Sequence, residues 1–255
     1  QPSLMGFRMH LSLRLILAAV ALLSVVAPNH AEASDARRRV LFCTDIAMGL
    51  DCTNVFGSPP SAADPDDAWA IAWALNNPDW EVVGVVVSFG NCACETPPPT
   101  CDAPAPDPGQ IACEVLDEQI EIARWVVQAC GRETPVYRGA SRRFALDGPA
   151  PDGTTEALEA VLADPEPVTI IGIGPATDPA YLVRDLAALG RLDRVERLML
   201  EMGQIGPWAG QAGFTINGMP VSDYNFRSDP DAAKWLFDTA DLLPETTLVP
   251  FNSIR

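Results

Sequence analysis

Histidine is nearly absent from this chain. Its two histidines, His10 and His30, both lie before residue 34, in a segment that we expect to be cleaved. From residue 34 onward the chain therefore offers no imidazole. Sites built on a Ser-His-Asp or Cys-His arrangement are excluded, because both need a histidine as the base.

Positive charge is also scarce. The chain has 17 Lys and Arg against 34 Asp and Glu, a formal net charge of −17. The expected leader contributes Arg8, Arg14 and Glu32 to this balance, so the remainder is slightly more acidic still. An acidic surface repels phosphate groups, and we expect no nucleic-acid partner. The same surface is compatible with a bound cation.

The chain has a single long apolar run, close to its start. Arg8 and Arg14 precede the run Leu15 to Ala27, and Ala31-Glu32-Ala33 has the small-residue pattern of a cleavage site. The apolar run is short for a membrane span, and the pattern is typical of a secretory signal peptide. We predict a signal peptide over 1–33, one domain over 34–255, a secreted or periplasmic location, and no membrane association after cleavage.

All seven cysteines follow residue 33. Export favours disulfides. Cys43 lies in a predicted buried strand and is expected to be unpaired, whereas the other six can form up to three bridges of undetermined pairing. A zinc site is the alternative, disfavoured because no Cys-x-x-Cys pair recurs and histidine is missing. The six are Cys52, Cys92, Cys94, Cys101, Cys113 and Cys130.

Apolar strand patterns alternate with helical patterns after residue 38. Continuous Val and Ile runs, such as that from 82 to 87, suit strands buried on both faces. The alternation predicts an α/β fold with a mostly parallel open sheet covered by helices. The expected strands are Val40–Cys43, Glu81–Ser88, Val168–Ile173, Arg197–Glu201 and Thr247–Phe251; the expected helices are Asp66–Asn76, Val115–Cys130, Thr155–Leu162, Pro179–Leu189 and Pro230–Asp238.

Two loops and an acidic cluster follow predicted strand ends, where open α/β sheets bind ligands. The loops are 52–63 and 92–109, and the cluster is Asp64-Pro65-Asp66-Asp67. Carboxylates gathered in this way suit a hard cation such as calcium. Helix capping is the alternative, with Asp64 as N-cap and Pro65 as the first helical residue. The cluster by itself leaves both interpretations open.

Six motifs in order resemble those of the calcium-dependent, inosine-uridine-preferring nucleoside hydrolases. They are Thr44-Asp45 with Asp64-Pro65-Asp66-Asp67-Ala68; Val83-Gly84-Val85 leading to Gly90-Asn91; Val136-Tyr137-Arg138-Gly139-Ala140, similar to "PVYRGA"; Gly174-Pro175-Ala176-Thr177-Asp178, similar to "GPLTN"; Met202-Gly203-Gln204; and Asn217 with Asp223-Tyr224-Asn225 and Asp229-Pro230-Asp231-Ala232-Ala233, similar to "N…EFN…DPEAA". The resemblance implies a nucleoside-hydrolase-like α/β fold.

The resemblance also implies roles for particular residues. Asp45 would activate the attacking water and share in binding Ca²⁺, with Asp67 and the Thr177 carbonyl as further metal ligands. The substrate-binding residues would be Asp66, Asn91, Asn217, Asp223 and Asn225. Calcium then holds the ribose diol and the water, an aspartate takes a proton from the water, and the N-glycosidic bond breaks.

Several positions depart from the family pattern. Cys43 and Asp223 replace an aspartate and a glutamate, and the chain lacks the family's carboxy-terminal part, with its His-Asp pair and last calcium aspartate. We therefore expect a fragment or a shortened, divergent member. The favoured hypothesis is calcium-assisted hydrolysis of a small nucleoside or related ribosyl compound. The alternatives are a non-catalytic protein that retains the ribose site and, least favoured, an ordinary exported domain. A homo-oligomer is left open.

The cysteine pattern generates a first prediction. Mass analysis of alkylated protein, with and without prior reduction, should show at least two disulfides and a free Cys43, because export favours bridges in the cysteine-rich loops. Seven alkylatable thiols after exposure to oxidising medium would contradict it.

Overall fold

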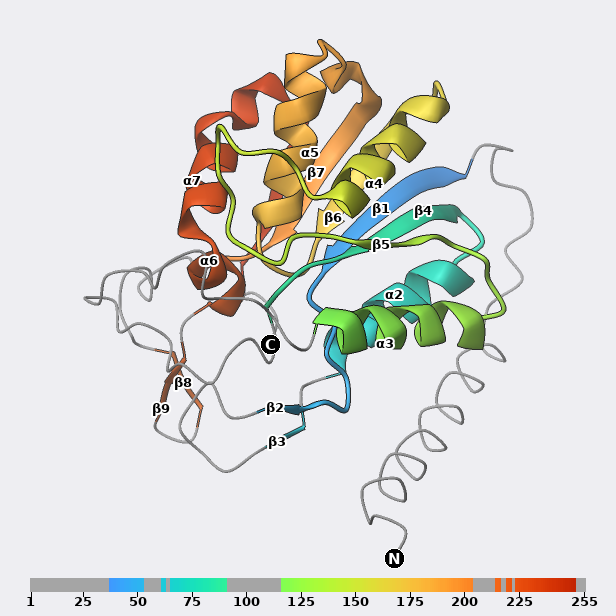
Figure 1. Cartoon of the computed structure of the whole chain (residues 1–255), viewed down its shortest axis with the longest axis vertical. Helices are drawn as coiled ribbons and strands as arrows, with labels where there is room; N and C mark the ends of the chain where they lie inside the picture. The colour runs from blue at the N-terminus through green and yellow to red at the C-terminus, as the bar shows by residue number, and fades with distance from the viewer. Residues whose placement is uncertain are drawn as a thin grey trace, which may run out of the picture.

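A six-stranded parallel sheet lies at the centre of the fold (Figure 1). The computed structural model describes residues 37–52, 61–62, 65–90, 116–203, 214–216, 219–221 and 223–250. The strand order is β10-β7-β6-β1-β4-β5, and every neighbouring pair is parallel. The predicted parallel sheet is confirmed. Its strands are β1 (Arg38–Thr44), β4 (Trp80–Val87), β5 (Val136–Arg138), β6 (Val168–Gly172), β7 (Val195–Glu201) and β10 (Thr246–Val249).

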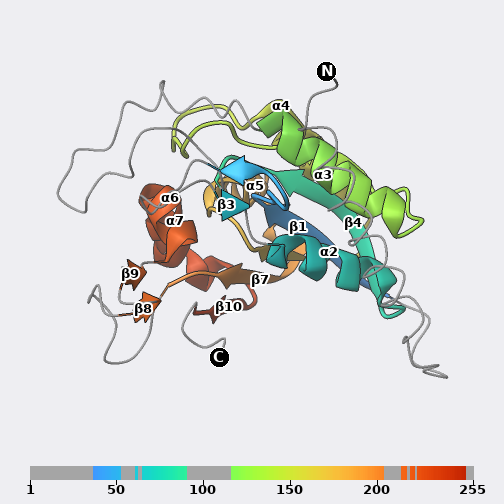
Figure 2. The ribbon, with the colours of Figure 1, turned by 90° about the horizontal axis from the view of Figure 1, so that it is seen from below.

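Helices cover the sheet on both faces (Figures 1 and 2). Helices α2 (Asp66–Asn76) and α3 (Leu116–Ala129) pack on one face, and α4 (Asp152–Ala163), α5 (Thr177–Ala188) and α7 (Pro230–Asp238) pack on the other. The predicted helices are confirmed to within a few residues. The smaller elements are β2 (Asp51–Cys52), β3 (Ser61–Ala62), β8 (Phe214–Ile216), β9 (Met219–Val221), α6 (Tyr224–Ser228) and the 3₁₀ turns η1 (Leu192–Arg194) and η3 (Ala240–Leu242).

Side-chain alternation in β1 explains the two cores. Val40 and Phe42 pack under α2 and α3, whereas Leu41 and Cys43 pack under α4 and α5. Because successive side chains of a strand point to opposite faces, a strand covered on both sides must be apolar throughout. The unbroken apolar run of β1 therefore places it in the middle of the sheet.

Two sequence predictions need correction. Helix α2 begins at Asp66 with Pro65 in the N-cap position and no side-chain cap, so Pro65 is not the first helical residue; Asp64 lies outside the described residues. Cys130 is a free thiol, as is the fully buried Cys43. The prediction of an unpaired Cys43 is confirmed, but Cys130 does not join the bridges. The side chains of the other five cysteines lie outside the described part.

The predicted signal peptide also lies outside the described residues and stays a prediction. Within the part of the chain that the structure describes, the helices are too short or too polar to cross a membrane.

The direction of the connections changes beside β1. From β1 the chain proceeds through α2 to β4 on one side, whereas β6 lies on the other side of β1 and leads on to β7. In open α/β sheets, ligands bind outside the carboxyl ends of the strands at such a switch point. The switch lies between β1 and β6, so Thr44-Asp45 and the segment after Gly172 are placed together.

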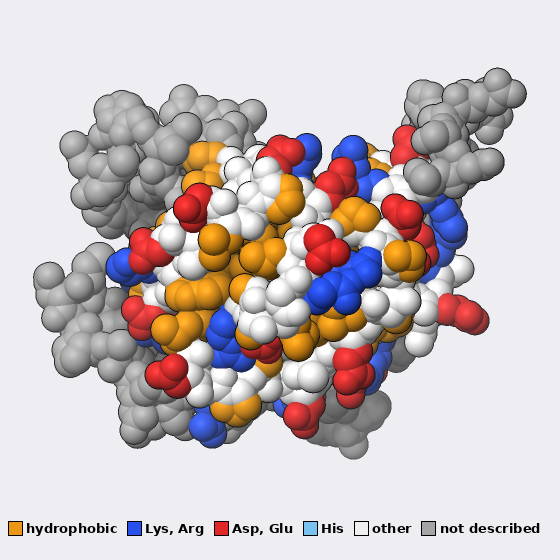
Figure 3. Space-filling view, turned by 90° about the horizontal axis from the view of Figure 1, so that it is seen from above, with side chains coloured by type: hydrophobic (Ala, Val, Ile, Leu, Met, Phe, Trp, Pro, Cys, Tyr) orange, Lys and Arg blue, Asp and Glu red, His pale blue; other side chains and the backbone are white. Residues whose placement is uncertain are grey.

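Charges of both signs occur on the face seen from above in Figure 3, interspersed with hydrophobic side chains. The large negative net charge is therefore not gathered into one uniform patch on this face.

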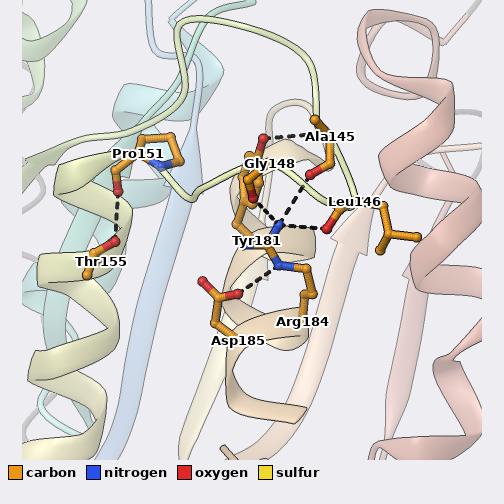
Figure 4. Close-up of polar contacts among 8 residues, drawn as sticks. All are labelled: Ala145, Leu146, Gly148, Pro151, Thr155, Tyr181, Arg184 and Asp185. Atoms are coloured by element: carbon orange, nitrogen blue, oxygen red, sulfur yellow. Dashed lines mark hydrogen bonds and ion pairs between the residues drawn. The ribbon is translucent and has the colours of Figure 1, made fainter. Parts of the chain in front are cut away.

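Arg184 of α5 fastens the loop between β5 and α4 (Figure 4). Its guanidinium donates hydrogen bonds to the carbonyls of Ala145 (3.2 Å), Leu146 (3.0 Å) and Gly148 (2.6 Å). It also pairs with Asp185 at 2.7 Å. The carbonyl groups of this loop, which has no regular secondary structure, thus take their hydrogen bonds from one side chain.

The Arg184 contacts generate a stability prediction. Arg184→Met keeps an apolar stem but leaves the three carbonyls without their donor, and it should lower the free energy of unfolding by about 2 kcal/mol. Urea denaturation measures this. Arg124→Met removes an exposed pair with Glu121 and should lose roughly 0.5 kcal/mol or less. Equal losses in the two variants would contradict the assignment.

Candidate active site

Five of the predicted site residues gather at the carboxyl edge of the sheet. Asp45 follows β1, Asp67 lies in the first turn of α2, and Thr177 begins α5 after β6. Asp223 is the N-cap of α6, and Asn225 lies within that helix. All five are buried, which is unusual for carboxylates unless they are hydrogen-bonded or bind a cation. Asn91 and Asn217 lie outside the described residues.

Thr44 joins the end of β1 to the start of α2. Its hydroxyl donates to Asp67 Oδ2 at 2.5 Å and accepts from the Ile46 backbone N–H at 3.1 Å. The Asp67 carboxylate therefore lies beside the residue that precedes Asp45. Asp66, in contrast, is exposed, and its Oδ1 accepts the Asp67 N–H at 2.9 Å. The neighbouring acids of α2 thus have different surroundings: Asp67 faces the sheet and Asp66 faces solvent.

Two glycines leave room for the Asp45 carboxylate. A Cβ on Gly90, which follows β4, would overlap Asp45 Oδ2, and a Cβ on Gly174, which follows β6, would lie 2.7 Å from Asp45 Oδ1. We call Gly90 and Gly174 the glycine cradle. It holds the carboxylate of the central strand between the ends of its two neighbouring strands, so a larger residue at either glycine would displace Asp45.

Gln119 supports Asp45 from helix α3. Its side-chain amide donates to the Asp45 carbonyl at 2.9 Å and is fully buried. The apolar residues Leu116, Ile120 and Ala123 recur at helical spacing around it and place that face against the sheet. No motif in the sequence marks Gln119, because a glutamine on an apolar helix face has no distinguishing local pattern.

Asp229 fixes the start of α5. It accepts from the Thr177 hydroxyl at 2.6 Å and from the Phe144 N–H at 2.7 Å, and it caps α7 through the Ala232 N–H at 3.1 Å. Burial raises its pKa, while these three hydrogen bonds and Arg143 act in the opposite direction. Asp229 was part of a recognised motif, but the sequence did not predict its contact with Thr177.

Asp223 and Asn225 attach α6 to the ends of β6 and β7. The Asp223 carboxylate accepts from the backbone N–H groups of Gly203 and Phe226, and burial raises its pKa. The Asn225 amide donates to the Ile173 carbonyl at 3.1 Å and to the Glu201 carbonyl and carboxylate at 2.9 and 2.6 Å. Both predicted ribose-binding residues therefore also hold their own segment in place.

Asp178, next to Thr177, is a completely buried carboxylate. It accepts from the Ala140 N–H at 3.1 and 3.2 Å and from the Thr154 hydroxyl at 2.5 Å. Burial raises its pKa to about 6, although these bonds and one from Ser88 favour the charged form. The sequence resembles "GPLTN" here, with Asp178 at the position of the asparagine. Its protonated form resembles asparagine in being neutral.

The residues that the family resemblance assigns to a cation offer only oxygen atoms. Asp45 and Asp67 have carboxylates and Thr177 a backbone carbonyl, and oxygen ligands fit a hard ion such as Ca²⁺. The tight cradle around Asp45 fixes one of these carboxylates. Within the described ranges, His, Cys, Asp and Glu side chains form no group of three or more with the placement of a metal site. Any metal site at this edge would therefore take fewer than three such side chains from the described residues.

Comparisons with known proteins agree on one family. Residues 114–255 match the model of the inosine-uridine preferring nucleoside hydrolases. The pyrimidine-specific ribonucleoside hydrolase RihA of Shewanella sp. strain MR-4 is 31% identical over 183 residues, covering 68% of this chain and 52% of the relative. RihA of Escherichia coli strain SMS-3-5 is 27% identical over 187 residues, covering 68% and 54%. The chain spans about half the length of these curated relatives.

Solved structures share the fold. The inosine-uridine preferring nucleoside hydrolase of Bacillus anthracis has a TM-score of 0.51 at 17% identity, with 85% of this chain and 65% of that chain covered. The type III effector XopQ, solved with adenosine diphosphate ribose, has a TM-score of 0.52 at 20% identity, with 92% and 61% covered. At such identities the likeness establishes the nucleoside-hydrolase-like fold.

Asp178 generates a pH-dependent prediction. Its pKa is higher in the folded protein, at about 6, than the ordinary 3.8, so its stabilising effect is complete below about pH 4 and is lost as the pH rises through 6. Asp178→Asn stays neutral throughout. Relative to wild type, its free energy of unfolding should rise by about 2 kcal/mol between pH 4 and pH 7.

Urea denaturation at both pH values measures this difference. The exposed Asp147→Asn is the control and should follow wild type. Parallel stability of Asp178→Asn and wild type across the range would show that Asp178 does not bind a proton more tightly in the folded state.

Proposed function

Because the chain belongs to the inosine-uridine preferring nucleoside hydrolase family, we propose that it hydrolyses the N-glycosidic bond of a ribonucleoside or a related ribosyl compound. The observation that carries the proposal is the Asp45 carboxylate, buried in the glycine cradle at the switch point of the sheet. Asp67 accepts a hydrogen bond from Thr44, the residue before Asp45, and the proposed ribose-binding α6 borders the same edge. This shared edge supports the proposal, because hydrolysis needs a water-activating carboxylate close to the bound sugar.

Asp45 is the proposed general base. It takes a proton from a water molecule, and the water oxygen bonds to the anomeric carbon. The carbon–nitrogen bond breaks, and its electron pair leaves with the nucleobase. The fixed position of the carboxylate favours this step, because a base must lie within hydrogen-bond reach of its proton. Asp66, Asn91, Asn217, Asp223 and Asn225 are the proposed contacts of the substrate, as the resemblance implies.

Ca²⁺ is the proposed cofactor. Asp45, Asp67 and the Thr177 carbonyl are the residues that would hold it, and the Asp229 contact with the Thr177 hydroxyl supports that turn. When bound, the ion supplies positive charge that favours ionisation of a nearby water and orients the sugar hydroxyls.

A ribose-binding protein without catalysis is the alternative. It is favoured by the hydrogen bonds that Asp223 and Asn225 already make with backbone groups. It is also favoured by the lack of histidine from residue 34 onward, since protonation of a purine leaving group then falls to a carboxyl group.

The activity prediction separates these two functions. The chain should cleave p-nitrophenyl riboside in the presence of Ca²⁺, because that leaving group needs no proton, and should cleave inosine or uridine slowly or not at all. Asp45→Asn should lower the rate of p-nitrophenol release at least about 100-fold, as expected for loss of a general base. The exposed Asp147→Asn should keep the wild-type rate.

Two outcomes would overturn parts of this account. Rapid inosine turnover would show that the chain does supply a proton to the leaving group. Absence of riboside cleavage, with ribose still bound in calorimetry, would establish the binding-protein alternative.

A further inference from the structure

Three consecutive residues of the α6 segment contact the ends of different strands. Asp223 accepts from Gly203, which follows β7, and Asn225 donates to Ile173, which follows β6. Tyr224, between them, donates its hydroxyl to the carbonyl of Gly90, which follows β4, at 3.0 Å. The segment is therefore held on both sides of β1.

The strand order makes the Tyr224 contact a bridge across the site. Between β6 and β4 in the sheet lies only β1, the strand that Asp45 follows. Gly90 is also a member of the glycine cradle and packs against Asp45 Oδ2. The Tyr224 hydroxyl thus connects the proposed ribose-binding segment to the backbone that confines the proposed base.

We propose that Tyr224 is a positioning residue of the hydrolytic site, whose hydroxyl holds α6 to Gly90 and so sets the separation between bound ribose and Asp45. The inference rests on the proposed function. The motif that this segment resembles, "EFN", has phenylalanine at the position of Tyr224, so the hydroxyl is a feature of this chain. A ribose held by Asp223 and Asn225 would shift relative to Asp45 without this connection, because the reacting atoms need close alignment.

Tyr224→Phe tests the proposal, since it removes the hydroxyl and keeps the ring. Tyr181→Phe is the matched control: the Tyr181 hydroxyl accepts the Ala145 N–H at 3.0 Å, in the loop fastened by Arg184. Each variant loses a hydrogen bond of 3.0 Å made by a tyrosine hydroxyl. Differences between the two therefore report on the place of the hydroxyl and not on the loss of a bond as such.

For Tyr224→Phe, kcat for p-nitrophenyl riboside should fall roughly fivefold, the effect of one hydrogen bond, because ribose is then held out of alignment with Asp45. The ribose Kd from calorimetry should change less than kcat. In Tyr181→Phe both values should stay at wild type while thermal stability falls. Unchanged kcat in Tyr224→Phe, or equal changes in the two variants, would overturn the positioning role.

Hydrogen exchange gives a readout that needs no substrate. Tyr224→Phe should speed the exchange of backbone amides in both 88–90 and 224–228, two segments far apart in sequence, and Tyr181→Phe should affect neither. Faster exchange in 224–228 alone, or in neither segment, would show that the hydroxyl does not hold them together. If the wild-type chain neither binds ribose nor cleaves the riboside, the proposed function is wrong, and the exchange result still decides whether the bridge exists.

Discussion

The close approach of the Asp45 carboxylate to Gly90 and Gly174 is the constraint on which the site depends. It requires the carboxyl ends of β4, β1 and β6 to lie level, because only then can both glycines contact one side chain. The parallel pairing of β1 with both neighbours supplies that alignment, and Cys43 pairs with Val86 on one side and Gly172 on the other. The sheet register therefore fixes the position of the proposed base.

Three further buried acids hold the segments next to this site. Asp178, Asp223 and Asp229 each accept two or more hydrogen bonds, yet burial raises the pKa of all three. A buried carboxylate is unfavourable unless its partners compensate for the lost hydration. Each of these acids ties the first turn of a helix to a distant loop or strand end. These acids therefore position the helix starts, although neutral side chains would be easier to bury there.

Much of the fold followed from local sequence patterns. The apolar run of β1 and the helical spacing in α3 predicted their elements to within a few residues, because burial on both faces of a strand and on one face of a helix leaves different periods in the sequence. Short elements escaped prediction: α6 has five residues and no apolar period. The bounds of α2 were predicted correctly, but the capping alternative placed Pro65 one position too far along, since proline suits both the N-cap and the first helical position.

The sequence by itself determined the order of elements, the parallel sheet and, through its ordered motifs, the residues that make up the proposed site. Only the tertiary structure decided how those residues are held. Gln119 reaches Asp45 across 74 positions, Asp229 reaches Thr177 across 52, and Tyr224 reaches Gly90 across 134. Such contacts depend on which strands become neighbours in the sheet, and that order arises from packing of the whole chain and leaves no periodic signal near any one residue.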